Sequence, residues 1–218
     1  MVRWEDEGMT GPTEQSVSTR RAAALAGHTG DSPLARRLLT DPDPGTRATA
    51  LGALNRLGEL SSDELLQALS DPAPTVRRRG CEESVIWSGT VGDPQEPAIA
   101  LAVARLLDDE NDTVVETAAW ACGERPPVTT GTLARLCTVA TGHADALCRE
   151  AAVAALGALG DTAGLAAILE ATGDKATVRR RAMIALAPFD GPEVDAALQR
   201  GREDRDWQVR QAAEDLSS

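Results

Sequence analysis

The sequence predicts an all-α fold in which helix pairs stack into a solenoid, and three observations support this prediction. Residues 148–161, CREAAVAALGALGD, place alanine and leucine at three- and four-residue steps along one helical face. Related stretches, aligned on the position that is usually arginine, recur at residues 47, 77, 115, 149, 179 and 210. Turn formers precede them, as in DPDPGTR (41–47). A period of 30 to 40 residues in a helical chain is typical of a solenoid.

The amino-terminal part is predicted to be a tail followed by a cap. Residues 1–17 are expected to be flexible, and residues 18–218 are expected to form a single repeat domain, because stacked units share one core. From Thr19, TRRAAALAGHTGD predicts a lone helix that ends at Gly27 or Gly30. This half-repeat would cover the amino-terminal end of the stack, ahead of about six full repeats.

The first three repeats are then placed by their turns and caps. Repeat 1 is expected to have helices at 33–40 and 46–57. In repeat 2, Ser61-x-x-Glu64 predicts a capping box, and a second helix follows near 75–87. Glu83 and Ser84 make this helix the least regular copy. The longest connection, 88–97, leads into repeat 3, which ends at Gly123.

The last three repeats are separated by prolines and glycines. Pro126-Pro127 predicts an extended link before repeat 4, whose second helix is the 148–161 stretch. Repeat 5 ends at Pro188, and repeat 6 begins after Gly191-Pro192. Its second helix, DWQVRQAAEDL, has the polar end that suits a carboxyl-terminal cap.

An aspartate that precedes Val-Arg by a short turn, followed by an alanine-rich helix, resembles the HEAT-repeat family. The similarity is to the short bacterial HEAT-like repeats that also occur in phycobilin lyases, and it covers roughly residues 18–217. It implies a right-handed solenoid in which aspartates and arginines form a structural ladder. Val115 and His143 occupy an arginine and an aspartate position and interrupt this ladder. The expected ladder residues are Asp41, Arg47, Asp71, Arg77, Asp109, Arg149, Arg179, Asp204 and Arg210.

Composition limits the classes of partner and the cellular setting. A net charge of −12 argues against binding to nucleic acid or to an anionic membrane, since both need a basic surface. No apolar run reaches membrane-spanning length, and the acidic start lacks the features of a signal peptide. Four scattered cysteines are expected to be reduced and mostly buried. Together with arginine's dominance over lysine, these features predict a cytoplasmic protein of a GC-rich bacterium.

Enzymes of HEAT fold are the alternative class. The family includes di-iron hydroxylases that use His-Glu motifs, but this chain has no His-Glu pair. It also includes DNA glycosylases for alkylated bases, to which Asp206-Trp207-Gln208-Val209-Arg210 is faintly similar, although the acidic charge opposes DNA binding. A bilin-lyase-like or glycosylase-like activity therefore remains the alternative, with no catalytic residue, metal ligand or cofactor predicted.

The favoured function is protein–protein interaction or scaffolding along the concave face. On a helical wheel, the positions one, four, five and eight residues after the ladder position, which is the position usually occupied by arginine, are expected to lie on the outward face of each second helix. In HEAT solenoids this face lines the concave surface, and here it would be an apolar strip flanked by charge. Burial of Trp120 against neighbouring helices is the competing interpretation. The predicted partner-binding residues are Glu116, Trp120, Glu150, Val153, Arg180, Met183 and Ile184.

Overall fold

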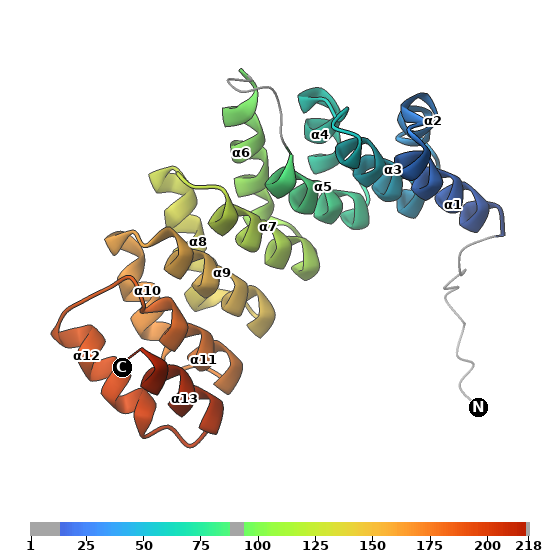
Figure 1. Ribbon diagram of the computed structural model, residues 1–218. Helices are drawn as coiled ribbons and strands as arrows, with labels where there is room; N and C mark the ends of the chain where they lie inside the picture. The colour runs from blue at the N-terminus through green and yellow to red at the C-terminus, as the bar shows by residue number, and fades with distance from the viewer. Residues whose placement is uncertain (1–13, 88–93, 217–218) are drawn as a thin grey trace, which may run out of the picture.

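The computed structural model describes residues 14–87 and 94–216, and this part of the chain is entirely helical. It contains thirteen α-helices and two short 3₁₀ helices, and none of the described residues lies in a β-strand. Helix α1 stands alone at the amino-terminal end, and the other twelve α-helices follow as consecutive pairs (Figure 1). The predicted all-α solenoid of helix pairs is therefore confirmed.

The helices fall into three groups. The lone helix is α1 (Glu14–Thr29). The first helices of the pairs are α2 (Ser32–Leu38), α4 (Ser62–Leu69), α6 (Glu96–Arg105), α8 (Thr130–Gly142), α10 (Leu165–Ala171) and α12 (Pro192–Arg202). The second helices are α3 (Pro44–Arg56), α5 (Pro74–Ile86), α7 (Asp112–Glu124), α9 (Ala146–Leu159), α11 (Ala176–Ala185) and α13 (Trp207–Asp215). The 3₁₀ helices are η1 (Leu106–Asp108) and η2 (Thr162–Gly164).

The boundary predicted for the amino-terminal tail is wrong by a few residues. Helix α1 begins at Glu14, so residues 14–17 belong to the first helix rather than to a tail. The rest of the predicted tail, residues 1–13, lies outside the described residues. Helix α1 packs mainly on α3, as expected for a half-repeat next to the first full pair.

The helices form two layers, and the stack curves (Figure 1). The odd-numbered helices lie on the inner side of the curve, and the even-numbered helices lie on the outer side. Neighbouring odd-numbered helices contact one another much more extensively than neighbouring even-numbered helices do. This difference accounts for the curvature, because the outer layer splays while the inner layer stays closely packed.

Side-chain caps fix where four of the six second helices start, whereas α5 and α11 begin without one. Asp43 accepts a hydrogen bond from the Thr46 backbone N–H at 2.8 Å, and Pro44 occupies the first helical position, where its missing N–H does no harm. The capping box predicted for repeat 2 is also confirmed. Ser61 Oγ accepts from the Glu64 backbone N–H, and the Glu64 carboxylate accepts from the Ser61 N–H at 2.9 Å. The turns that the sequence marks with aspartate and proline therefore begin helices as expected.

Small residues let adjacent inner helices approach closely. A Cβ added to Gly157 on α9 would lie 2.6 Å from Ala185 Cα on α11. A Cβ on Gly123 of α7 would likewise lie 2.8 Å from Ala155 Cα on α9. Neither backbone could stay in place with a larger residue at these positions. Buried alanines and leucines fill the remaining space, including Leu156 on α9.

The irregular second helix of repeat 2 is explained by buried polar partners. Glu83 is buried, pairs with Arg79 at 2.8 Å and accepts a hydrogen bond from Asn55 Nδ2 on α3. Ser84 is also buried, and its hydroxyl donates to the Cys81 carbonyl at 2.7 Å. Both polar side chains are therefore satisfied where the pattern would place apolar residues.

Four arginines join consecutive repeats by bidentate ion pairs. In Arg47, Nε and Nη2 donate to Asp71 of the next repeat at 2.9 and 2.7 Å, and Nη1 donates to the Asp41 carbonyl of its own turn. The other three rungs have the same geometry. They are Arg77–Asp109, Arg149–Asp174 and Arg179–Asp204. Hydrogen bonds from the arginines hold the pKa values of Asp174 and Asp204 below their ordinary value.

The ladder includes one residue that the sequence pattern missed and differs from the expectation at both ends. Asp174 lies five rather than six residues before Arg179, because its turn is one residue shorter, and it is the partner of Arg149. At the amino-terminal end, Asp41 accepts from the Asp43 N–H, while Arg20 pairs with Asp43. Arg210 at the other end donates to the Asp204 carbonyl, and the described residues give it no partner aspartate.

The predicted break in the ladder falls between α7 and α9. Val115, in the arginine position, is buried, and His143 stands in the aspartate position. His143 Nδ1 accepts a hydrogen bond from the Asp145 backbone N–H at 3.1 Å. This bond reproduces the one that Asp71 Oδ1 accepts from the Ala73 N–H in an intact repeat. A neutral imidazole thus keeps the turn without leaving a carboxylate opposite a valine, so the two replacements compensate for each other.

Candidate functional site

The residues of the predicted partner-binding strip differ in their exposure on the surface. Trp120 and Ile184, both five residues after the ladder position, are 42% and 41% exposed. Val153 and Met183, four residues after it, are 0% and 1% exposed, so their assignment to the surface is wrong. On a wheel of about 100° per residue, the fourth position lies roughly 40° from the ladder residue and packs between adjacent inner helices. The fifth position, at roughly 140°, reaches the concave face.

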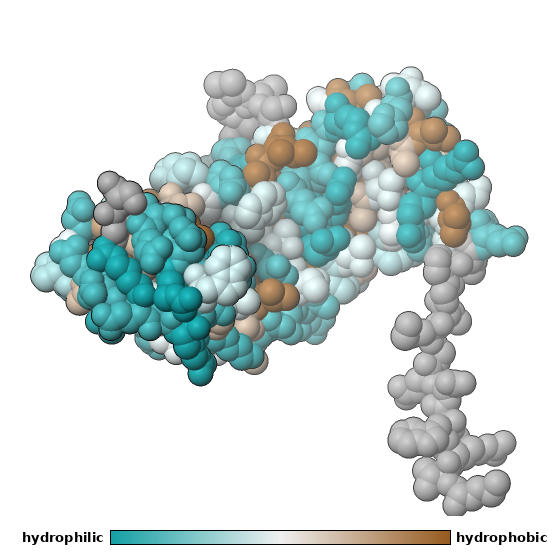
Figure 2. Space-filling model, turned by 60° about the horizontal axis from the view of Figure 1, so that its bottom comes forward, coloured by the Kyte–Doolittle hydropathy of each residue, from teal (hydrophilic) through white to brown (hydrophobic). Residues whose placement is uncertain are grey.

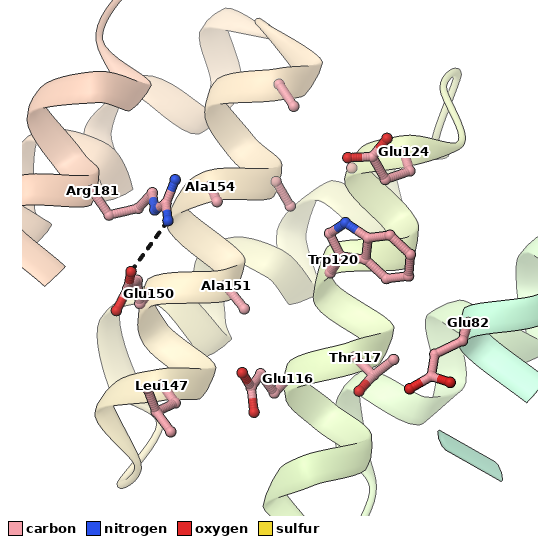
Figure 3. A pocket seen from close by; sticks show the side chains of 13 residues that line it. Glu82, Glu116, Thr117, Trp120, Glu124, Leu147, Glu150, Ala151, Ala154 and Arg181 are labelled. Atoms are coloured by element: carbon pink, nitrogen blue, oxygen red, sulfur yellow. Dashed lines mark hydrogen bonds and ion pairs between the residues drawn. The ribbon is translucent and has the colours of Figure 1, made fainter. Parts of the chain in front are cut away.

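The largest hollow on the concave face is a cleft between α7 and α9 with a volume of about 770 Å³. Residues one, two, five and nine positions after the ladder position provide much of its lining, and most come from these two helices. Figure 3 shows Trp120 on α7, with Ala151 and Ala154 on α9 across the cleft. We call this hollow the α7–α9 cleft. Its lining residues are Glu82, Glu116, Thr117, Trp120, Gly123, Glu124, Leu147, Glu150, Ala151, Ala154, Ala155, Ala158 and Arg181.

The cleft has an apolar floor because the inner helices are close together there. Ala151, Ala154 and Ala158 lie on α9, and Gly123 on α7 approaches Ala155 too closely for any side chain. Trp120 stands above this floor with much of its surface accessible, and Leu147 is exposed at the amino-terminal end of α9. The competing interpretation, in which Trp120 is buried against its neighbours, is therefore wrong.

Carboxylates surround the cleft, and only some of them are neutralised. Glu82 pairs with Arg78 at 2.9 Å and with Arg79 at 3.1 Å. Glu150 pairs with Arg181 at 3.3 Å, as the dashed line in Figure 3 marks. Glu116 and Glu124 form no ion pair with any residue of the described chain. The cleft therefore carries uncompensated negative charge on both sides of Trp120.

A second hollow of about 320 Å³ lies between α11 and α13. Ile184 and Arg180, both predicted as binding residues, line it together with Trp207 and Leu216. Trp207 is 64% exposed. Figure 2 shows a mostly hydrophilic face on which hydrophobic residues gather in small separate patches. The large exposed apolar side chains of α7, α9, α11 and α13 are thus divided between two hollows instead of forming one continuous strip.

Three functional candidates on this surface escaped the sequence pattern. Leu147 lies two residues before its ladder position, Glu124 lies nine residues after, and Trp207 lies three residues before. None of these offsets is among those that the helical wheel places on the outward face. A wheel rotated by about 60° would have found the first two. Trp207 lies at the start of α13, directly after the N-cap residue Asp206. A large apolar side chain next to a turn is the sequence feature that could have indicated its exposure.

The ladder break brings together a group of potential metal ligands. Asp112, His143 and Cys148 offer atoms that lie within 4.8 Å of one another. However, His143 Nδ1 already accepts a backbone hydrogen bond, which places the proton of a neutral imidazole on Nε2, 3.8 Å from the Asp112 carboxylate. Cys148 donates to the Asp112 carbonyl at 3.2 Å, and burial raises the pKa of its thiol to about 12. His143 and Cys148 thus present N–H and S–H groups, which leaves the Asp112 carboxylate as the one member with free lone pairs, so the geometry of the group fits a structural role.

One of the remaining sequence predictions concerns the cysteines, and the structure also places the two histidines. Cys81, Cys122 and Cys148 are buried, as expected, and burial raises the thiol pKa of Cys122 to about 12. His28 is exposed, whereas His143 is half-buried in its turn and not on the open surface. None of the described helices combines the length and the apolar character needed to cross a membrane.

The repeats, the two-layered stack and the arginine ladder agree with a family match. HEAT repeats match residues 13–86 and 133–217. This chain belongs to the HEAT-repeat family. The match leaves out residues 87–132, which contain α6 and α7 with the cleft residues Glu116, Thr117, Trp120, Gly123 and Glu124. The HEAT pattern is thus weakest at the place where the inner face is most deeply hollowed.

Solved structures resemble this HEAT-repeat protein in fold. YibA from Escherichia coli is 19% identical, with a TM-score of 0.69 over 98% of this chain and 79% of that chain. A designed armadillo repeat protein in complex with the peptide (KR)4 is 17% identical, with a TM-score of 0.62 over 85% of this chain and 97% of that chain. An engineered protein has a TM-score of 0.62 at 18% identity, over 85% and 94% of the two chains. No curated protein matches the sequence.

Proposed function

We propose that this HEAT-repeat protein is a scaffold that binds a partner protein along its concave face, with the α7–α9 cleft as the principal contact. The observation that carries the proposal is the exposed indole of Trp120 above an apolar floor. Tryptophan is the residue type most enriched among the energetic anchors of protein interfaces. An apolar side chain left accessible in a concave, charge-rimmed hollow has the character of a binding surface.

The second hollow supports the same function. Ile184 and Trp207 are exposed on the same inner layer of helices, two and three repeats along the stack from Trp120. A partner that follows the concave face would meet both hollows in turn, and the Glu150–Arg181 ion pair lies on the helices between them. Among the structures of similar fold, the designed armadillo repeat protein is in complex with a peptide. That complex supports the proposal of peptide binding by this fold.

The test is selection of partners that depend on Trp120. Random twelve-residue peptides displayed on phage would be selected on the wild-type protein and counter-selected on the Trp120→Ala variant. We expect enriched peptides whose affinity falls at least about 30-fold in Trp120→Ala, because removal of an interface anchor costs about 2 kcal/mol or more. Failure to enrich any peptide that distinguishes the two proteins would overturn the proposal.

A matched tryptophan separates a binding defect from a folding defect. Trp87 is 9% exposed, and its indole N–H donates to the Leu60 carbonyl at 2.9 Å. Trp87→Ala should therefore destabilise the fold by about 3–5 kcal/mol, as expected for a core tryptophan. Trp120→Ala should shift the melting temperature by only a few degrees, since about 1 kcal/mol corresponds to 2–4 °C in a chain of this size. A Trp120→Ala variant that melts as early as Trp87→Ala would place Trp120 in the core.

A further inference from the structure

The charge balance of the α7–α9 cleft indicates the chemistry of its partner. Arg181 is engaged by Glu150, and Arg78 and Arg79 are engaged by Glu82. The described chain therefore supplies no free cation to Glu116 or Glu124. A neutral or acidic partner that covered the cleft would strip water from these carboxylates without replacing it, which is unfavourable. Cationic side chains would offset this loss.

The spacing of the two carboxylates adds a geometric requirement. Glu116, Trp120 and Glu124 are four residues apart on α7, so they form a stripe on one side of the helix. With a rise of 1.5 Å per residue, the two glutamates are about 12 Å apart along the helix. In an extended chain, residues i and i+4 project from the same side and lie about 13 Å apart, with residue i+2 between them on that side. An extended segment parallel to α7 thus matches the stripe position by position.

The floor of the cleft also suits a backbone in close contact. Ala151, Ala154 and Ala158 carry no long side chains, and Gly123 carries none. A regular helix with its side chains is about 10–12 Å across, whereas an extended strand needs less width. The residue at i+2 would rest on the exposed indole of Trp120, where an aliphatic chain gains burial and a cation gains a cation–π contact.

We infer that the α7–α9 cleft binds an extended segment of a partner protein that carries two lysine or arginine residues four positions apart. The two cations pair with Glu116 and Glu124, and the residue midway between them covers Trp120. This inference rests on the proposed function and specifies the class of partner. The same unpaired carboxylates would repel the phosphate backbone of a nucleic acid.

The test uses the peptides selected through Trp120, measured individually by fluorescence anisotropy with fluorescein labels. We expect the enriched sequences to share basic residues at i and i+4. The variant Glu116→Gln with Glu124→Gln should bind them about five- to tenfold more weakly at low salt, as expected for the loss of two solvent-accessible ion pairs. Raising the salt to about 0.5 M should weaken the wild type toward the same level.

Two controls isolate the charge and the conformation of the segment. Glu193→Gln with Asp195→Asn removes two exposed carboxylates from α12 in the outer layer, gives the same net charge as the test variant and should leave the affinity unchanged. Proline placed at i+1 or i+3 of the peptide should be tolerated by an extended segment, whereas it would break a helix. Loss of binding on proline substitution would show a helical occupant and overturn the extended geometry.

The outcomes distinguish this inference from the proposed function. Trp120-dependent peptides without basic residues, or affinities that do not change in the double glutamine variant, would overturn the cationic segment and leave the scaffold function standing. Absence of any Trp120-dependent peptide would overturn both. Equal melting temperatures of the test and control variants would show that the loss of affinity is not a loss of fold.

Discussion

The central segment 87–132 differs from the repeats on either side of it in how neighbouring repeats are joined. Residues 13–86 and 133–217 match HEAT repeats, and within them Arg47–Asp71, Arg149–Asp174 and Arg179–Asp204 join one repeat to the next. The central segment takes part in one rung, Arg77–Asp109, and lacks the next one because Val115 replaces the arginine. Across that gap, α7 and α9 instead make the most extensive contact of any two helices in the described chain.

The difference shows that the inner helices stay closely packed where a rung of the ladder is missing. Where the rung is missing, Gly123 lets the backbone of α7 approach Ala155 on α9. The same close approach leaves room above it for the α7–α9 cleft and for the exposed Trp120. In this chain the repeat that lacks its ladder arginine is therefore the one that provides the candidate binding surface.

Acid should have the largest effect, because it weakens all four rungs together. The paired aspartates Asp71, Asp109, Asp174 and Asp204 have folded-state pKa values below their ordinary value. Their contribution to stability is therefore full above about pH 5 and is lost as the pH falls below about 4 through the folded-state pKa values. Melting curves between pH 6 and pH 2.5 should show a steep decline in this window. An Arg77→Met variant should show a shallower decline, since one rung is already absent; parallel curves would contradict the ladder's role.

The second-largest loss of stability is expected when one partner of a single rung is removed. Arg77→Ala leaves Asp109, which is largely buried, without its bidentate partner. The expected loss is about 3–5 kcal/mol in the free energy of unfolding, measured by urea denaturation. Arg78→Ala on the same helix removes an exposed ion pair with Glu82 and should cost less than about 1 kcal/mol. Equal losses for the two variants would show that the ladder contributes nothing beyond surface charge.

Filling the glycine contacts tests whether packing continues across the ladder break. Gly157→Ala forces a methyl group against Ala185, and Gly123→Ala forces one against Ala155. Each should lower the free energy of unfolding by about 1–3 kcal/mol. Gly142→Ala, at the end of α8 with no atom near its Cβ position, should instead raise it by up to about 1 kcal/mol. A neutral Gly123→Ala with a destabilising Gly157→Ala would show that the inner layer is loose at the break.

Restoring the missing rung should have the smallest effect on stability, but it tests the ladder break most directly. His143→Asp places a carboxylate opposite Val115 and should cost about 1–2 kcal/mol. Combining it with Val115→Arg should recover part of that loss, with a coupling of about 1 kcal/mol or more in a double-mutant cycle. Additive effects would contradict the interpretation that Val115 and His143 compensate for each other.

The sequence predicts the architecture well, because a repeat samples the same physical pattern several times. Helix starts follow from caps such as Asp43 and Ser61, and four of the ladder arginines follow from their spacing. Asp174 escaped because a turn shortened by one residue shifts it out of the pattern while leaving its carboxylate within reach of Arg149. Residue spacing can predict where a turn lies, but it does not predict which side chain of the next repeat a residue in that turn will contact.

The exposed residues of the concave face were predicted less completely for a geometric reason. The helical wheel fixes the angle between residues on one helix, but it does not fix how each helix is rotated against its two inner-layer neighbours. That rotation buries Val153 and Met183 and exposes Leu147 and Glu124. The sequence also does not show which charged side chains pair, since Arg181 forms an ion pair with Glu150 of the preceding repeat. Trp120 was found because its position lies in the overlap between the assumed and the actual exposed faces.

The accessible indole of Trp120 also gives the protein a built-in optical reporter. The chain has four tryptophans and no tyrosine, so its intrinsic ultraviolet emission comes almost wholly from indoles. Trp87 is shielded from water, whereas Trp120 and Trp207 are wet and should emit at longer wavelength. A ligand that covers one of these wet indoles will shift its emission to the blue. Comparing the wild type with Trp207→Phe would then tell, without any label, which of the two hollows has been filled.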